Sequence, residues 1–392
     1  MHPITRDCLI TASVCVALLV SPGALAQSEE TAKPQQIESP NKSAAVPIDL
    51  GTPAKQGKSG ETVLLPIPKS SPAIGTGLQL IGAHFFNADP KSQPSVLAAS
   101  AGYYTSDTWF VGAGGSLNLD NDRWKIMAGG GYVNANYDFY GVGNAAGEAG
   151  IAAPINQTGT AVLAKALRLV ATDWYAGIGY RYLNSNVGLR VSLPNAPELE
   201  QILQTGTTIV SSGPLLNLIY DSRDLITNPH EGSLMEFEAL FANAAVFGSD
   251  NSYRHTYIKA SHYWPVSKSN TLAGQVVLCH ATDNAPFFDL CLFGSQNDLR
   301  GYTVGRFQDF TMFATQLEFR SEFRDRWGAV VFAGVGEVAP TFGAMDSENL
   351  LPSGGFGIRW MAAKKNKVNI RADVAWGKYE NALFYLSIGE AF

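Results

Sequence analysis

Apolar and polar residues alternate with a period of two, segment after segment, from residue 62 to the last residue of the sequence. In residues 366–377 the apolar positions are Val368, Ile370, Ala372, Val374 and Trp376. The positions between them are Asn369, Arg371, Asp373 and Ala375. Successive side chains of a β-strand point to opposite faces, so this pattern predicts strands with one apolar face and one small or polar face.

We expect about 16 such strands, an even number that suits a closed barrel. Their predicted ranges are 63–71, 74–87, 94–104, 107–119, 122–137, 157–170, 173–187, 207–221, 233–245, 252–265, 270–281, 309–323, 327–338, 353–363, 366–377 and 382–392.

The apolar faces of these segments end in large aromatic residues such as Trp109, Trp174 and Trp376. A soluble β-sandwich also alternates, but its apolar faces seldom end in tryptophan and tyrosine. A transmembrane barrel has aromatic girdles on its outer wall and a small or polar lumen side. The sequence therefore predicts an all-β transmembrane antiparallel barrel over residues 62–392. Phe392, the last residue, would be its C-terminal assembly signal, on the same apolar face as Phe384, Leu386 and Ile388.

The N-terminal segment has the features of an export signal, predicted at residues 1–26. Arg6 supplies a basic region, Leu9 to Val20 an apolar region, and Ala24-Leu25-Ala26 a cleavage site. Residues 27–61 are rich in Ser, Pro, Lys, Gln and Ala, and they hold too little apolar surface to offset the entropy of ordering. We expect them to form a disordered periplasmic tail.

Composition excludes two further classes of protein. Mean hydropathy is zero, and no apolar run of about 18 residues follows the signal, so a helical membrane protein is excluded. The net charge of −6 excludes a basic nucleic-acid surface. In an oxidising compartment the two cysteines beyond the signal, Cys279 and Cys291, either form a disulfide or remain free thiols.

Connection lengths predict the orientation of the barrel. The connections at 138–155, 188–206 and 280–308 are long, whereas those at 105–107 and 267–269 are short. Outer-membrane barrels have long external loops and short periplasmic turns. With an even strand count, we expect the N-terminal tail and the C-terminus both to be periplasmic.

Five motifs in order along the chain resemble one known family. They are Tyr137-Asp-Phe-Tyr-Gly-Val-Gly-Asn144, Ile219 to Gly232, Leu299-Arg300-Gly301-Tyr302, Leu317-Glu-Phe-Arg320 and Gly355-Phe-Gly-Ile-Arg359. Together they resemble the outer-membrane protein assembly and translocation superfamily, the BamA/TamA-like bacterial surface antigen barrels. The resemblance implies that the long loop bearing Leu299, Arg300, Gly301 and Tyr302 folds back into the lumen.

The resemblance also implies an acidic partner for Arg300, because an unpaired charge in a lumen is costly. The family places that acid in a Phe-x-Asp-x-Gly strand, but here Gly334 occupies the position of the acid. Strand parity puts Leu317 and Phe319 toward lipid, so Glu318 is our leading candidate partner and Glu322 the next. The alternative is that Glu318 pairs only with Arg320 or Arg359 across the wall.

The second motif contains Asp221, Arg223, Asp224, Pro229 and Gly232. These residues are typical of a hairpin turn that fixes strand register, and a partner-docking role is the alternative. Members of the family that insert other barrels carry periplasmic polypeptide-transport-associated (POTRA) domains before the barrel. The polar segment 27–61 is too short for one, so we expect this chain to belong to the stand-alone branch.

Three function classes remain. The first is a gated translocation or insertion factor in outer-membrane protein or lipid biogenesis, which would open between its first and last strands. Pro66, Pro68 and Pro72 would weaken the pairing of the first strand there, and Glu390 falls on the otherwise apolar face of the last strand. The second is a passive or structural outer-membrane pore plugged by its own loop, without insertase activity.

The third class, an enzyme, has little support. Adjacent strand residues such as Ser261 and His262 point to opposite faces and cannot act together, and no catalytic or metal-binding motif is present. We therefore expect no enzymatic activity, no cofactor and no metal. The expected partners are outer-membrane lipid and the barrel-assembly machinery that inserts the chain itself. The aromatic exterior would permit a homodimer.

Overall fold

The computed structural model describes residues 60–71, 74–192, 201, 203–294, 298–364 and 367–392. The predicted signal peptide (1–26), nearly all of the predicted tail (27–61) and Pro72 lie outside these residues.

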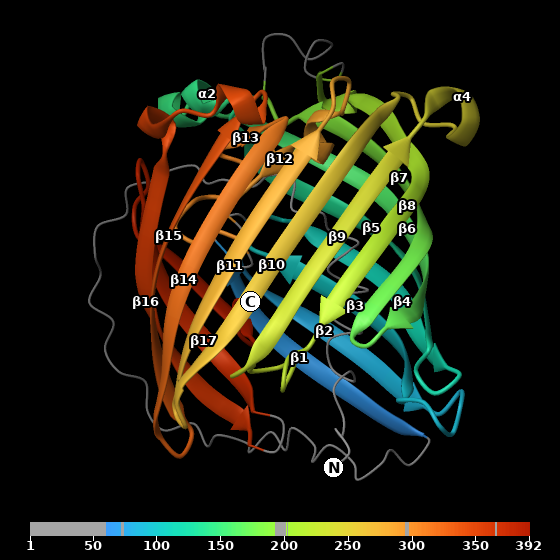
Figure 1. Cartoon of the computed structure of the whole chain (residues 1–392). Helices are drawn as coiled ribbons and strands as arrows, with labels where there is room; N and C mark the ends of the chain where they lie inside the picture. The colour runs from blue at the N-terminus through green and yellow to red at the C-terminus, as the bar shows by residue number, and fades with distance from the viewer. Residues whose placement is uncertain (1–59, 72–73, 193–200, 202, 295–297, 365–366) are drawn as a thin grey trace, which may run out of the picture.

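The described residues form a closed antiparallel barrel of sixteen strands (Figure 1). The barrel strands are β1 (Glu61–Ser71), β2 (Gly75–Phe86), β3 (Ser95–Tyr104), β4 (Trp109–Leu119), β5 (Trp124–Phe139), β6 (Ala153–Ala171), β7 (Trp174–Leu189), β8 (Thr207–Asp221), β9 (Gly232–Ala242), β10 (Tyr253–Ser267), β11 (Asn270–Ala281), β14 (Thr311–Arg324), β15 (Trp327–Ala339), β16 (Leu351–Ala363), β17 (Val368–Gly377) and β18 (Leu383–Ile388). Each strand pairs with its neighbours along the chain, and β18 closes the barrel against β1.

The predicted fold class is confirmed, and each predicted range overlaps one of these strands. Two predicted ends are wrong. Strand β9 stops at Ala242 because Asn243 caps the short helix α4 (Ala244–Phe247), accepting a hydrogen bond from the Val246 amide. Strand β18 stops at Ile388, since Gly389 adopts a φ of 86° that turns the chain out of the strand.

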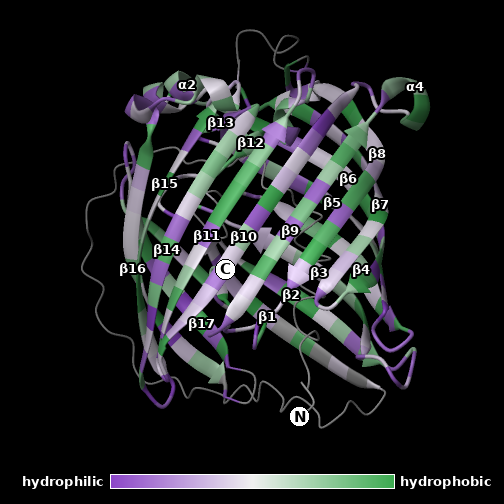
Figure 2. Cartoon of the chain, in the orientation of Figure 1, coloured by the Kyte–Doolittle hydropathy of each residue, from purple (hydrophilic) through white to green (hydrophobic). Residues whose placement is uncertain are grey.

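Alternation along the strands separates a lipid-facing wall from the lumen, as the hydropathy colours of Figure 2 show. On β14, Leu317 is 53% and Phe319 37% exposed on the outer wall. Gln316 and Glu318, which alternate with them, are buried inside the barrel. Within the described residues, no helix has the length and apolarity needed to cross a bilayer.

The two ends of the barrel differ in their connections. The loop end carries the long connections 140–152, 190–206, 282–310 and 340–350, together with α2 (Asn144–Ala149) and α4. The turn end carries brief connections such as 172–173, 268–269 and 325–326, together with the start of β1 and the end of β18. The turn at 105–107, short as predicted, lies at the loop end, so connection length alone does not separate the ends.

The closure of the barrel is its weakest strand pairing. Strand β1 pairs with β2 in eleven consecutive positions, from Glu61 opposite Phe85 to Ser71 opposite Gly75. Against β18, the described residues register one pair, Ser70 opposite Leu386. Pro66 and Pro68 lie in β1 and have no backbone N–H to donate to a ladder. We call the β1–β18 junction the seam.

Candidate functional site: the lumen loop and its ion pairs

The connection between β11 and β14, residues 282–310, folds into the barrel, and we call it the lumen loop. It contains the turn η1 (Phe287–Asp289) and a two-stranded ribbon of β12 (Cys291–Leu292) and β13 (Gln308–Asp309). Its apolar side chains are completely buried against the inner wall: Phe293, Leu299, Tyr302 and Phe307. The lumen loop is therefore packed like a core element, and it fills part of the lumen.

Arg300, near the tip of the lumen loop, is fully buried in a ring of acceptors. Its Nη2 lies 2.5 Å from Glu318 Oε2 on β14, and its Nη1 lies 2.8 Å from Asp373 Oδ2 on β17. Its Nε donates to Gln316 Oε1 at 3.2 Å. The ring of Phe332 lies flat below the guanidinium, with its centroid 3.4 Å from Cζ. One loop side chain thus connects strands on two parts of the wall.

Glu318 and Asp373 each bind further arginines. Glu318 accepts from Arg320 Nε at 2.7 Å and lies 3.7 Å from Arg359 Nη2. Asp373 accepts from Arg359 Nη1 at 2.5 Å. These carboxylates and guanidinium groups form one connected ion-pair network, and its core is shielded from solvent. Such a network holds the loop only while its charges remain matched, because each buried charge depends on its partners.

The structure separates the two acidic candidates. Glu318, the leading candidate, contacts Arg300 and also Arg320 and Arg359, so the alternative pairing occurs alongside the predicted one. Glu322 lies at the turn end, 3.7 Å from Lys367 Nζ and 3.2 Å from Asn228 Nδ2. Asp373 was not predicted as a partner of Arg300, although the alternation in residues 366–377 placed it on the polar face.

Two glycines explain how the loop fits. A Cβ at Gly334 would lie 2.6 Å from Leu299 Cδ1, so the loop's leucine occupies the space that the family's acid would need. Gly301 has a φ of 106°, and a Cβ there would lie 2.6 Å from the Trp376 carbonyl oxygen. The departure at Gly334 therefore goes together with a different acid, Asp373, on another strand.

Tyr302 and the residues after it attach the loop to the loop end of the barrel. The Tyr302 hydroxyl donates to the Pro352 carbonyl at 2.6 Å, and the Gly301 amide donates to the Tyr385 hydroxyl at 3.0 Å. Arg306 reaches Glu380 at 3.3 Å and donates to the Gly147 carbonyl of α2 at 3.0 Å. These contacts join the lumen loop to two other loops of the same end.

The aromatic-rich third loop, Tyr137–Asn144, lies against the lumen loop. The Gly143 amide donates to the Gln308 carbonyl at 2.8 Å, and Gln308 Nε2 donates to the Gly141 carbonyl at 2.9 Å. Tyr137 donates its hydroxyl to Gln157 at 2.6 Å. The first of the five motifs thus lies against the loop that carries the third.

The first limb of the lumen loop has an anchor of its own at Asp289. This buried carboxylate forms an ion pair with Arg181 on β7 and accepts a hydrogen bond from the Tyr253 hydroxyl on β10. Ser211 on β8 donates to it at 3.2 Å. This anchor was not predicted, because Asp289 lies in a loop without periodicity.

Cys279 on β11 and Cys291 on β12 form a disulfide in the structure. His255 Nε2 lies 3.3 Å from Cys279 Sγ, and the donor atoms of the three residues are within 4.8 Å of one another. Both sulfurs are committed to each other, which leaves His255 as the single available ligand of that group. The bond fastens the first limb of the loop to the wall beside Asp289.

The hairpin motif surrounds the β8–β9 turn at the turn end. Asp221 accepts two hydrogen bonds from the Arg223 guanidinium, each at 2.8 Å. Asp224 Oδ1 accepts from the amides of His230 and Glu231, on the far side of Pro229, at 2.9 and 3.1 Å. Gly232, with a φ of 103°, starts β9. These contacts agree with the register-fixing interpretation.

The end of the chain departs from its predicted position. Beyond Gly389, Glu390 accepts from Arg359 Nε at 2.7 Å and from Asn369 Nδ2 at 2.6 Å. Phe392 packs on the inner wall against Tyr263 and Ala273, and its carbonyl accepts from Arg320 Nη2 at 2.7 Å. The prediction that Glu390 and Phe392 share the apolar face of the last strand is therefore wrong.

Solved structures with a similar fold come from outer-membrane barrels. BamA from Haemophilus ducreyi lacking POTRA domains 1–3 aligns with a TM-score of 0.57 at 14% identity, over 84% of this chain and 71% of that chain. CdiB from Escherichia coli aligns with a TM-score of 0.59 at 9% identity, over 86% and 63%. CdiB from Acinetobacter baumannii aligns at 0.54 and 11%, over 83% and 58%. The chain thus spans less than two thirds of either CdiB. No curated protein matches the sequence.

The family model that describes the Omp85 superfamily domain matches residues 95–392, which include fourteen of the sixteen barrel strands. The resemblance carried by the five motifs is confirmed, and the fold indicates the outer membrane of a Gram-negative bacterium. Family and fold are those of an outer-membrane barrel and not of an enzyme. The chain belongs to the Omp85 superfamily.

Proposed function

We propose that this barrel is a gated translocation or insertion factor in outer-membrane protein or lipid biogenesis. Its substrate would pass sideways through the wall at the seam, while the lumen loop keeps the barrel closed along its axis. The observation that carries the proposal is the seam, where the described part of β1 meets β18 in one registered pair.

The small number of registered pairs between β1 and β18 makes the seam the junction at which the barrel would open most easily. Each of the other fifteen junctions is a ladder of at least six registered pairs, so separating it would break many backbone hydrogen bonds in lipid. At the seam few such bonds are lost, and the prolines of β1 have already removed two donors. Opening there leaves the lumen-loop network intact, because neither Glu318 nor Asp373 lies on a seam strand.

A disulfide across the seam tests this proposal. In the variant Ser70→Cys with Leu386→Cys, oxidation joins the one registered pair. In proteoliposomes, we expect the reduced protein to accelerate the insertion of an unfolded small barrel or the movement of fluorescent phospholipid between leaflets. Oxidation should return both rates to those of protein-free vesicles, and reductant should restore them.

The matched control is Ala101→Cys with Val111→Cys, a lipid-facing pair in the continuous β3–β4 ladder. It carries the same native disulfide, so it separates the effect of the seam from that of reductant on Cys279 and Cys291. Equal rates for locked and reduced seam variants would rule out lateral opening.

The second candidate function is a passive or structural pore without insertase activity. It is favoured by the depth of the plug, in which the tip of the lumen loop is fully buried and tied to several strands. In that case wild-type protein would accelerate neither insertion nor lipid movement in the assay above.

We also propose how the barrel is oriented in the outer membrane and what it contacts there. The start of β1 and the end of β18 share the turn end, and the long connections share the loop end, which supports a periplasmic position for both termini. The partners would be outer-membrane lipid and the assembly machinery that inserts this barrel. Exposed aromatic residues on the outer wall, such as Tyr103 and Tyr180, leave room for a homodimer.

A further inference from the structure

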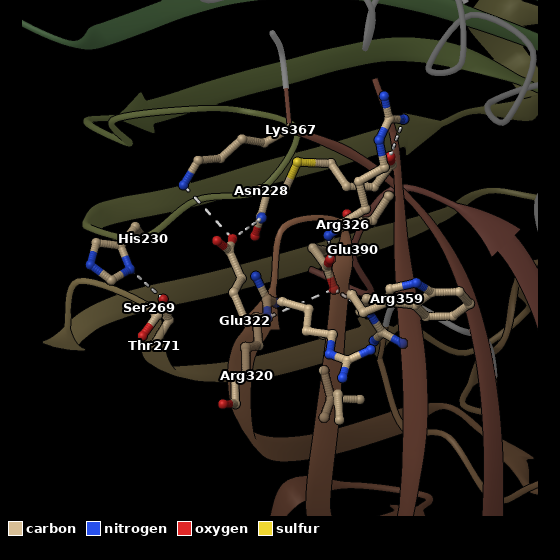
Figure 3. Close-up of a pocket in the computed structure, with 18 of the residues that line it drawn as sticks. Asn228, His230, Ser269, Thr271, Arg320, Glu322, Arg326, Arg359, Lys367 and Glu390 are labelled. Carbon is tan, nitrogen blue, oxygen red and sulfur yellow. Dashed lines mark hydrogen bonds and ion pairs between the residues drawn. The ribbon is translucent and has the colours of Figure 1, made fainter. Parts of the chain in front are cut away.

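A cavity opens at the turn end of the barrel, where the connections β10–β11, β14–β15 and β16–β17 lie close together (Figure 3). Its cavity volume is about 30 Å³, and it is partly open to solvent. Buried Arg320 and Arg359 line it, together with residues of these three connections and with Asn228 and His230 of the β8–β9 connection. None of the described residues of the lumen loop lines it.

The lining of this cavity is strongly basic. Six basic side chains line it: Lys268, Arg320, Arg324, Arg326, Arg359 and Lys367. The two acidic side chains, Glu322 and Glu390, are already engaged. Glu322 lies 3.7 Å from Lys367, and Glu390 binds Arg359 at 2.7 Å. Basic side chains therefore outnumber acidic ones in the lining, although the whole chain carries −6 and Glu318 and Asp373 bind Arg320 and Arg359 from behind the cavity.

Arg320 supplies a second, independent observation. It is 6% exposed, its Nε binds Glu318 and its Nη2 donates to the Phe392 carbonyl. Its Nη1 has no hydrogen-bond partner among the described residues. Arg359 Nη2 likewise makes no hydrogen bond there, although Glu318 lies 3.7 Å away. A buried guanidinium N–H without an acceptor is costly, and an anion in the cavity would relieve that cost.

The charge of the rim is local. The other connections of the turn end carry acids, among them Asp89, Asp122 and Asp173. Lys91 and Arg123 also lie in those connections, where acids outnumber them, so only the side with the cavity has an excess of basic residues. Trp327 lines the cavity and is 45% exposed on the outer wall, where tryptophan is typical of the membrane interface. The cavity consequently lies at the depth of lipid headgroups.

We propose that this cavity is a binding site for a phosphate group, carried by a phospholipid headgroup or by a free phosphate. Guanidinium groups present paired N–H donors that match phosphate oxygens, and lysines around the rim add charge. The proposal does not depend on opening of the seam. It assigns a ligand to the turn end, whereas the lumen loop closes the barrel from the loop end.

Binding can be measured on the purified full-length barrel in two arms. In the first, inorganic phosphate is titrated in detergent at constant ionic strength against chloride, and thermal stability reports binding. In the second, native mass spectrometry counts retained lipid after exchange from nanodiscs of phosphatidylcholine with or without phosphatidylglycerol. We expect saturable binding in at least one arm. A response to phosphatidylglycerol alone identifies a headgroup as the source, and a response to inorganic phosphate alone a free phosphate.

The test variant is Lys268→Gln with Arg324→Gln, which removes two rim charges and leaves Arg320 and Arg359 in place. Its matched control is Lys91→Gln with Arg123→Gln, which removes two charges from other connections of the same end. We expect affinity to fall about tenfold in the test variant and to stay unchanged in the control. Absence of saturable binding in both arms, or equal affinity of the two variants, would overturn the proposal.

Discussion

Replacing Glu318 by glutamine should cost the barrel about 3–5 kcal/mol of unfolding free energy, the range found when one partner of a buried ion pair is removed. Glutamine keeps the shape of the side chain and removes its charge. Arg300, Arg320 and Arg359 all lie within 4 Å of the Glu318 carboxylate, so three buried guanidinium groups lose one shared anion. Urea unfolding in lipid vesicles, followed by tryptophan fluorescence, measures the loss.

Glu322→Gln is the matched control, since it makes the same chemical change four residues away on the same strand. Glu322 is partly exposed at the turn end and pairs with Lys367 at 3.7 Å, so its loss should cost less than about 1 kcal/mol. The double variant Glu318→Gln with Arg300→Gln should lose less than the sum of the two single variants, because the two residues share a contact. Equal losses of unfolding free energy in Glu318→Gln and Glu322→Gln would contradict a stabilising role for the buried ion pairs around Glu318.

The second large effect is expected at Asp289→Asn, which should free the first limb of the lumen loop. This change leaves Arg181 buried without its anion, and a single amide oxygen remains to accept from Arg181, Tyr253 and Ser211. A loss of about 3 kcal/mol of local stability is expected for such a buried pair. Hydrogen exchange should therefore rise by two orders of magnitude or more, a factor of about 100 for each 2.8 kcal/mol, in residues 287–293.

Asp283→Asn provides the comparison, since Asp283 is an exposed acid of the same loop. The tip at Arg300 should keep its protection in both variants, because Glu318 and Asp373 still hold it. Reducing the Cys279–Cys291 disulfide in the Asp289→Asn protein should extend the exchange toward the tip. Unchanged hydrogen exchange in residues 287–293 after Asp289→Asn would show that Asp289 does not hold the first limb of the lumen loop.

The barrel itself could be predicted because lipid on one side and a lumen on the other impose a strict period of two. That period also gave the inward direction of Glu318. It did not give Asp373, because which inward residues of distant strands reach the same depth depends on strand tilt and stagger. The alternation of residues within one strand gives no information on strand tilt or stagger.

Loop and terminal contacts escaped prediction for a different reason. Asp289 lies in a segment without periodicity, and its partner Arg181 gave no signal beyond its parity. Phe392 was misplaced because Phe384, Leu386 and Ile388 set an alternation that Gly389 interrupts. Its position is determined by Arg320 and Tyr263, which are close to it only after the barrel has closed.

The central claim is that the lumen loop closes the barrel, and single-channel conductance in planar bilayers tests it most directly. Wild-type protein should be compared with a deletion of residues 284–306, with Arg300→Ala, and with a deletion of residues 244–247, a loop segment outside the network. The account predicts low, flickering current in the wild type and the 244–247 deletion, more frequent openings in Arg300→Ala, and a large steady current without residues 284–306. A large steady current already present in the wild type and unchanged by these alterations would contradict it.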